Sequence, residues 1–316
     1  MTGAYIHSVA LMGTVVTFHV VGNESEGLDE RAEAVARGVR WFEEIERSCS
    51  RFDPESEISK LSTRIGTVVE ATPLVFEAVR FALAVAEETD GAFDPTVGAL
   101  LEFHGFNREY KSGERVTSGL SAGDGPPPTY RDVHLDTDRN TITFTRPLLL
   151  DLGAVAKGLA VDMAVQELAP FENFAIDAGG DLYLGGTNAG GEPWTIGIRH
   201  PRDHDAFIDT LTVSNVAVCT SGDYERRNDE TGAHHIMDAG AGISSTQSAS
   251  VTVLASSTMV ADALGTAAFV LGPVRGIELL ERHGVDGFIV TPSLERFDTG
   301  GMRREYTLKL ADRRAS

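Results

Sequence analysis

The sequence predicts an α+β protein, and three observations support this fold class. Segments with apolar residues at helical spacing alternate along the chain with short runs rich in β-branched and aromatic residues, which are typical of strands. The chain has 316 residues, 42% of them hydrophobic, so it can bury a sizeable core. It shows no repeat of fixed period and no clean boundary in composition, and we therefore expect a single domain over residues 1–316.

Apolar residues recur every three or four positions in several segments, and this spacing predicts helices. The helices lie at about residues 28–45, 73–88, 155–168 and 259–271. Thr89-Asp90-Gly91 breaks the second pattern, and Gly272-Pro273 is a stop signal at which we expect the last of these helices to end.

Short runs of β-branched and apolar residues predict the strands. They cover residues 15–20, 133–135, 141–144, 174–176, 182–184, 194–198, 217–219 and 251–254. The run Leu148-Leu149-Leu150 is interpreted as a further strand that ends at Asp151. Residues 107–130 are rich in Gly, Ser and charge and contain Pro126-Pro127-Pro128, which favours a flexible surface loop.

The composition excludes several classes of partner. With 27 Lys and Arg against 47 Asp and Glu, the formal net charge is -20, which disfavours binding to nucleic acid and to anionic membranes. Two distant cysteines, Cys49 and Cys219, give neither a zinc motif nor a disulfide framework. We see no export signal and no apolar run approaching the roughly 20 residues that span a bilayer, so we expect a cytoplasmic protein without membrane insertion.

The predicted helix at 259–271 is apolar nearly all round, and Asp262 is its one charge. A buried carboxylate without a partner is costly, and a cation removes that cost. Thr266 lies four residues further on, hence on the same face, and offers a second oxygen. The pair suits magnesium, although an Asp paired with an Arg and a Thr bonded to its own helix remains an alternative.

Asp151 and Lys157 flank a Gly-Ala turn that opens the predicted helix at 155–168, a position at which phosphates bind well. A lysine in the first turn opposes the helix dipole, which favours a role facing an anion. An Asp that caps the helix and a solvated Lys are the alternative. Similarly, Asp177-Ala178-Gly179-Gly180-Asp181 allows close approach of a ligand to the backbone but also fits a tight hairpin.

His235 is a candidate general base, because an imidazole can accept a proton near neutral pH. It follows His234 at the start of a strand-like segment, and paired histidines in such a place also fit a polar surface.

Taken together and in this order, several segments resemble the ApbE family, the FAD:protein FMN transferases. The similar segments are Met12–Thr14, Ser50–Ser59, Thr89–Gly98, Asp151–Gly158, Asp177–Asp181, Thr220–Gly222, His235–Asp238 and Ala261–Thr266. The resemblance covers nearly the whole chain and implies an ApbE-like fold of mixed sheets with packed helices.

The resemblance implies transfer of FMN from FAD, the substrate, to a Ser or Thr hydroxyl of an acceptor protein with a flavinylation motif, with AMP leaving and Mg²⁺ required. It places the metal at the Ala154 carbonyl, Asp262, the Gly265 backbone and the Thr266 hydroxyl, and the activation of the acceptor hydroxyl at His235. The positions that fall at FAD contacts of the family are Met12, Phe52, Ala92, Phe93, Asp94, Asp151, Lys157 and Met237. The alternatives are a pyrophosphatase that splits FAD into FMN and AMP, and an FAD-binding protein without catalytic activity.

Overall fold

A computed structural model describes residues 2–23, 27–120, 126–228, 230–303 and 305–307. Its centre is an eight-stranded sheet in which every neighbouring pair of strands is antiparallel. Across the sheet the strands are β1 (Thr2–Leu11), β2 (Thr14–Asn23), β6 (Phe174–Ala178), β7 (Asp181–Gly185), β10 (Val216–Gly222), β13 (Ser250–Ala255), β14 (Asp286–Val290) and β15 (Arg296–Asp298).

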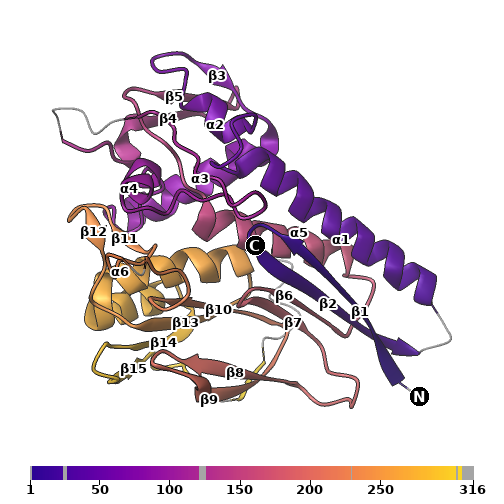
Figure 1. The fold of residues 1–316 in the computed structure, drawn as a ribbon. Helices are drawn as coiled ribbons and strands as arrows, with labels where there is room; N and C mark the ends of the chain where they lie inside the picture. Colours follow the sequence, from indigo (N-terminus) through magenta and orange to yellow (C-terminus); the bar gives the residue numbers. More distant parts are fainter. Residues whose placement is uncertain (1, 24–26, 121–125, 229, 304, 308–316) are drawn as a thin grey trace.

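Helices cover one face of this sheet and a small sheet covers the other (Figure 1). The covering sheet is formed by β16 (Glu305–Thr307), β9 (Asp203–Ser214) and β8 (Trp194–His200), and β16 pairs with β9 in parallel. Because β13 lies between the two layers, all of its residues are buried, including the polar Ser250 and Thr252. The expected α+β class with mixed sheets and packed helices is therefore confirmed.

The helical layer contains the four predicted helices and two shorter ones. They are α1 (Leu28–Cys49), α2 (Glu57–Leu61), α3 (Pro73–Glu88), α4 (Gly98–Phe103), α5 (Gly153–Glu167) and α6 (Thr258–Arg282). The bounds of α3 agree with the prediction because its start is well specified: Thr72 accepts a hydrogen bond from the N–H of Val75, and Pro73 occupies the first turn.

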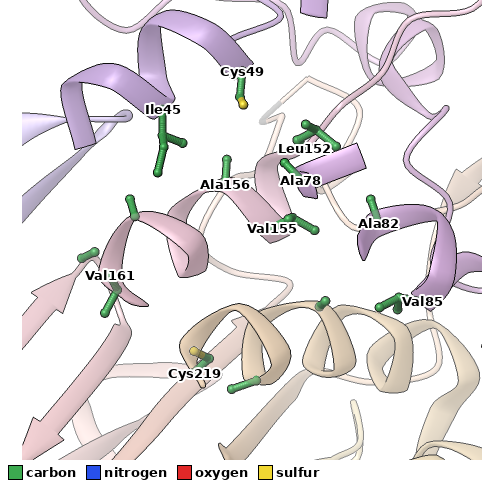
Figure 2. Packing of buried hydrophobic residues seen from close by; sticks show 14 of the residues in the cluster. Ile45, Cys49, Ala78, Ala82, Val85, Leu152, Val155, Ala156, Val161 and Cys219 are labelled. Carbon is green, nitrogen blue, oxygen red and sulfur yellow. The ribbon is translucent and has the colours of Figure 1, made fainter. Parts of the chain in front are cut away.

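Helix α5 lies at the centre of this layer, with small side chains facing its neighbours (Figure 2). It approaches α6 closely at Gly158, where a Cβ atom would lie 2.5 Å from the Cα of Met259. One turn later, the Asp162 carboxylate accepts hydrogen bonds from the Ser257 hydroxyl (2.6 Å) and from the N–H groups of Thr258 (2.7 Å) and Met259 (3.0 Å). This capping satisfies the first donors of α6 and fixes the two helices against each other.

Smaller elements complete the chain at the edges of the helical layer. They are the sheet of β3 (Val69–Glu70), β5 (Thr141–Phe144) and β4 (Val133–Asp136), the 3-10 helix Tyr130–Asp132, and the hairpin of β11 (Met237–Asp238) and β12 (Ile243–Ser244).

Two local predictions were wrong. Leu148-Leu149-Leu150 is buried but is not a strand, because Leu149 makes only an isolated bridge to Val97. A short apolar run without periodicity does not distinguish a strand from another buried segment. Helix α6 does not end at Gly272-Pro273 but continues beyond a kink, where Gly272 adopts a positive φ of 76°. Pro273 then fits the first turn of the continuing segment.

The expected loop at residues 107–130 contains neither helix nor strand in its described part up to Thr129, apart from the bridge between Arg108 and Arg115. Residues 121–125 of this prediction lie outside the described residues. Near its start, however, the loop is anchored, because the Tyr110 hydroxyl and the Lys111 ammonium each lie 2.6 Å from the Glu46 carboxylate on α1.

Helix α6 has the length and the mean hydropathy, 1.4, of a helix that could cross a membrane, and 61% of its most apolar window is buried inside the protein. It packs between α5 and the sheet, which is the position of a core helix (Figure 1). The sequence predicted the first part of α6 at residues 259–271, but the expectation that no apolar run approaches about 20 residues did not anticipate its full length.

Candidate active site

A cleft of about 1100 Å³ opens where the β1–β2 turn, α1, α5, α6 and the segment before β11 meet. It is large enough for a dinucleotide, since sites for small molecules span about 300–1,000 Å³. Every residue predicted above to bind FAD, to bind metal or to activate the acceptor lines this cleft, apart from Gly265. The fold thus brings together positions that lie from residue 12 to residue 266.

Lys157 lies at the inner end of the cleft, among oxygen atoms from three elements. Its ammonium is 3.0 Å from Asp181 Oδ2 on β7, 3.3 Å from Asp262 Oδ2 on α6 and 3.0 Å from the carbonyl oxygen of Gly153. The alternative of a solvated lysine is therefore wrong. The anions that Lys157 faces within the described structure are carboxylates.

Burial and neighbouring charge shift the protonation of this cluster. Burial alone would lower the pKa of Lys157, but the carboxylates of Asp181 and Asp262 raise it above its ordinary value. The pKa of Asp262 is raised, first by burial and then by the nearby Asp181 carboxylate, while Lys157 opposes the change. Two buried carboxylates share one ammonium, so the cluster has an excess of negative charge that favours a further cation.

The donors around Asp262 fit magnesium. Asp262 and Thr266 both line the cleft from one face of α6, and Ala154 lines it from a part of α5 where its backbone departs from helical geometry (φ −93°, ψ 15°). Among the described residues, no group of three or more His, Cys, Asp or Glu side chains could hold a metal ion. Hydroxyl, carbonyl and substrate oxygens would have to complete the shell, as is usual for Mg²⁺.

Gly265 lies behind this face rather than in the cleft. It is buried, and a Cβ atom there would lie 3.4 Å from the Ser221 hydroxyl oxygen and 3.5 Å from Val253 Cγ2. Its predicted role as a backbone ligand of the metal stays a prediction.

Asp151 both caps the start of α5, as the alternative above expected, and forms an ion pair that the sequence did not indicate. Its carboxylate accepts a hydrogen bond from the N–H of Gly153 (2.8 Å) at the start of α5, and it forms an ion pair with Arg51. Burial would raise the pKa of Asp151, but the adjacent Arg51 guanidinium holds it below its ordinary value. Asp151 thus stays ionised and fixes the start of the helix that carries Lys157.

The two adjacent histidines have different environments. His234 is buried, and its Nε2 lies 2.7 Å from the carbonyl oxygen of Ser245. His235 faces the cleft; its Nδ1 is buried without a hydrogen-bond partner among the described residues, and its backbone N–H donates to the Arg226 carbonyl (3.2 Å). Burial, together with the charges of Arg226 and Lys157, lowers the pKa of His235 to about 3. Its imidazole is therefore neutral at physiological pH, but in the free protein it is a weaker base than the expectation of proton acceptance near neutral pH assumed.

The outer part of the cleft contains the other predicted FAD contacts. Met12, at a positive φ of 52°, donates its backbone N–H to Glu46 Oε1 (2.8 Å), the carboxylate that also holds Tyr110 and Lys111. The Phe52 ring lies 4.1 Å below the Arg51 guanidinium. The neighbouring wall is formed by Ala92, Phe93 and Asp94, and Met237 is on the β11–β12 hairpin side.

The Asp94 carboxylate forms hydrogen bonds within the protein. It accepts hydrogen bonds from the Thr96 hydroxyl (2.7 Å), the Thr96 N–H (2.9 Å) and the Tyr130 N–H (3.1 Å). These bonds hold the shape of the Ala92–Asp94 turn, so the turn is preorganised.

Arg51, Asp181 and Arg226 are among the charged residues of the cleft to which sequence reasoning assigned no role. Asp181 closes the Gly179-Gly180 hairpin, and the interpretation of that segment stopped at the glycines; the turn is indeed a hairpin, with both glycines at positive φ. Arg51 and Arg226 lie in polar segments, where the spacing of apolar residues does not indicate the direction of the arginine side chains. Only the tertiary structure shows which cleft they face.

Comparison with known proteins agrees with the expected resemblance. A model of the ApbE family matches residues 12–289. The chain is 28% identical over 298 residues to an FAD:protein FMN transferase of Haemophilus influenzae, covering 88% of this chain and 84% of that protein. It is 31% identical over 277 residues to an FAD:protein FMN transferase of Treponema pallidum, covering 79% of this chain and 74% of that protein.

Solved structures show the same fold. The crystal structure of the ApbE protein from Thermotoga maritima matches with a TM-score of 0.81 at 32% identity, over 94% of this chain and 97% of that one. The flavin transferase ApbE from Vibrio cholerae also matches with a TM-score of 0.81, over 95% and 98% of the two chains; at 24% identity this likeness concerns the fold.

Proposed function

The chain belongs to the ApbE family, and we propose that it transfers FMN from FAD to a Ser or Thr hydroxyl of an acceptor protein, releasing AMP in a Mg²⁺-dependent reaction. The relatives named above are FAD:protein FMN transferases. The observation that carries the proposal is that one cleft holds both a buried oxygen cluster at Asp262 and a neutral imidazole at His235.

The reaction forms a phosphoester bond between the acceptor oxygen and the FMN phosphorus and breaks the diphosphate bond to AMP. Asp262, Thr266 and the Ala154 carbonyl are the residues that would hold magnesium, which supplies charge neutralisation at the diphosphate when bound. Lys157, already held by two carboxylates, keeps its charge at the same end of the cleft and orients the substrate.

His235 takes the proton of the acceptor hydroxyl as its oxygen attacks. The imidazole is neutral before FAD binds because burial and then the charges of Arg226 and Lys157 lower its pKa. The negative charge of bound FAD offsets these cations, so the basicity of His235 rises when it is needed. His234 cannot replace it, because its ring is buried against Ser245.

The adenine and flavin rings occupy the outer cleft. Phe52 offers a ring for stacking, and the fixed turn at Ala92–Asp94 offers a preformed wall. The remaining open side of the cleft leaves room for the acceptor segment, which carries the Ser/Thr flavinylation motif.

The test is AMP release from FAD and Mg²⁺, measured by chromatography with and without an acceptor domain that carries the motif. We expect AMP only when the acceptor is present. Equal AMP release without acceptor would show that water is the nucleophile and would favour an FAD pyrophosphatase. No release in either case would favour an FAD-binding protein without catalytic activity.

A further inference from the structure

Arg226 differs from the other cationic side chains that line the cleft. Lys111 is paired with Glu46, Arg51 with Asp151, and Lys157 with Asp181 and Asp262. Arg47 is paired with Glu44, and Arg108 donates to the Gly113 carbonyl. Within the part of the chain that the structure describes, the guanidinium of Arg226 donates to no carboxylate or carbonyl, although the chain carries a net charge of -20.

The Arg226 side chain reaches across the cleft. It belongs to the segment that leads from β10 to His235, yet its Nη2 atom lies 3.8 Å from the position of a Cβ atom at Gly13, in the β1–β2 turn on the other wall. Its charge acts on Asp151, Lys157, Asp262 and His235, so it faces the group of residues at which the reaction is proposed to occur.

The charge balance of the inner cleft explains why a free guanidinium would be kept there. In the cleft without a bound metal, the carboxylates of Asp151, Asp181 and Asp262 outnumber the cations of Arg51 and Lys157, so without Arg226 this inner cleft repels a diphosphate. A guanidinium presents several N–H donors in a planar fork that matches phosphate oxygens. An arginine without a protein partner can form these bonds without breaking an existing ion pair.

We propose that Arg226 binds the diphosphate of FAD directly and is the residue by which the cleft distinguishes FAD from flavins without phosphate. This inference rests on the proposed function, because FAD is the substrate that it assumes. It makes Arg226 a substrate-binding residue whose charge acts on Asp262, one of the proposed metal ligands.

The experiment measures the dissociation constants of FAD and of riboflavin by flavin fluorescence, without acceptor, for the wild-type chain, Arg226→Ala and Arg226→Lys. A charge-assisted hydrogen bond contributes enough that Arg226→Ala should weaken FAD binding by about 10-fold or more. Riboflavin binding should not change, because riboflavin has no phosphate. Arg226→Lys, which keeps the charge but loses the fork, should lie between the wild type and Arg226→Ala.

Arg227→Ala is the matched control, since Arg227 is the adjacent exposed arginine and does not line the cleft. It should bind FAD like the wild type. Equal FAD affinity of Arg226→Ala and wild type would overturn the inference, and so would an equal loss for riboflavin or for Arg227→Ala. A wild-type chain that binds FAD but transfers no FMN would contradict the proposed function while leaving the assignment of Arg226 intact; one that binds no FAD would contradict both.

Discussion

The ammonium of Lys157 on α5 lies 3.3 Å from Asp262 Oδ2 on α6, so the candidate site spans the contact between these two helices. One residue after Lys157, Gly158 allows the backbone of α6 to approach, and Asp162 caps the start of α6. The geometry of the site therefore depends on the packing of α5 against α6.

The first prediction concerns this packing. In an isolated helix Gly158→Ala would stabilise by roughly 0.5–1 kcal/mol, but here the new Cβ would lie 2.5 Å from the Met259 Cα, and backbone atoms cannot give way cheaply. We expect a net loss of about 1–3 kcal/mol in the free energy of unfolding, measured in urea. Gly300→Ala, where the nearest atom would be 3.5 Å away, is the control and should change stability little. A stabilised Gly158→Ala variant would show that α5 and α6 do not pack as described.

The second prediction concerns the buried ion pairs. Lys157→Met leaves Asp181 and Asp262 without their shared cation. We therefore expect the free energy of unfolding to fall by about 3–5 kcal/mol at pH 7 in metal-free buffer. Because the folded-state pKa of Lys157 is raised, its stabilisation is complete at neutral pH and is lost only as the pH rises above about 10.4. Lys60→Met, which removes an exposed ion pair with Glu55, should cost less than about 1 kcal/mol. Equal costs of the two substitutions would contradict the burial of the cluster.

The third prediction concerns His235. With a folded-state pKa of about 3, its imidazole should not titrate between pH 8 and 5 in NMR spectra of histidine-labelled protein. The His235→Gln variant assigns the resonance. In the unfolded chain the imidazole takes up a proton near pH 6.5, so stability should fall as the pH drops below that value, by at most about 1.4 kcal/mol per pH unit. The loss of stability that His235 causes below pH 6.5 should be missing in His235→Gln. A titration of His235 near pH 6.5 in the folded protein would contradict this expectation.

The fourth prediction concerns the thiols. Cys49 and Cys219 are both buried, and burial raises the pKa of Cys49 to about 12 and that of Cys219 above its ordinary value. Since the thiolate is the reactive form, neither should react with iodoacetamide at pH 8 in the native protein, and both should react in urea. Rapid alkylation of either cysteine in the native protein, followed by mass spectrometry, would show that the helical layer opens readily.

Much of the fold followed from the sequence because periodicity and end signals agreed. Helix α3 is the clearest case, since Thr72 and Pro73 define its start and Thr89-Asp90-Gly91 its end. The prediction was wrong where one signal has two structural outcomes. The Gly272-Pro273 pair stops one helical segment and also starts the next, and the sequence alone does not reveal that the axis continues.

The site was predictable only in part, for a similar reason. Asp262 was identifiable because a lone charge in an apolar helix is conspicuous, and the structure places it in the cleft with Thr266. The partners of Asp262 were not identifiable, because Lys157 and Asp181 lie far from it in the chain and meet it only through the antiparallel sheet and the α5–α6 contact. Arg226 lies in a polar segment without periodicity, so nothing in the sequence indicated the direction of its side chain.

The proposed reaction of this cleft links FMN to a protein hydroxyl. The most direct measurement is the intact mass of an acceptor domain after incubation with the chain, FAD and Mg²⁺. We expect an increase equal to FMN less one water with the wild-type chain, and none with Asp262→Ala or with an acceptor whose target hydroxyl is removed. An unmodified acceptor with the wild-type chain, or full modification with Asp262→Ala, would contradict it.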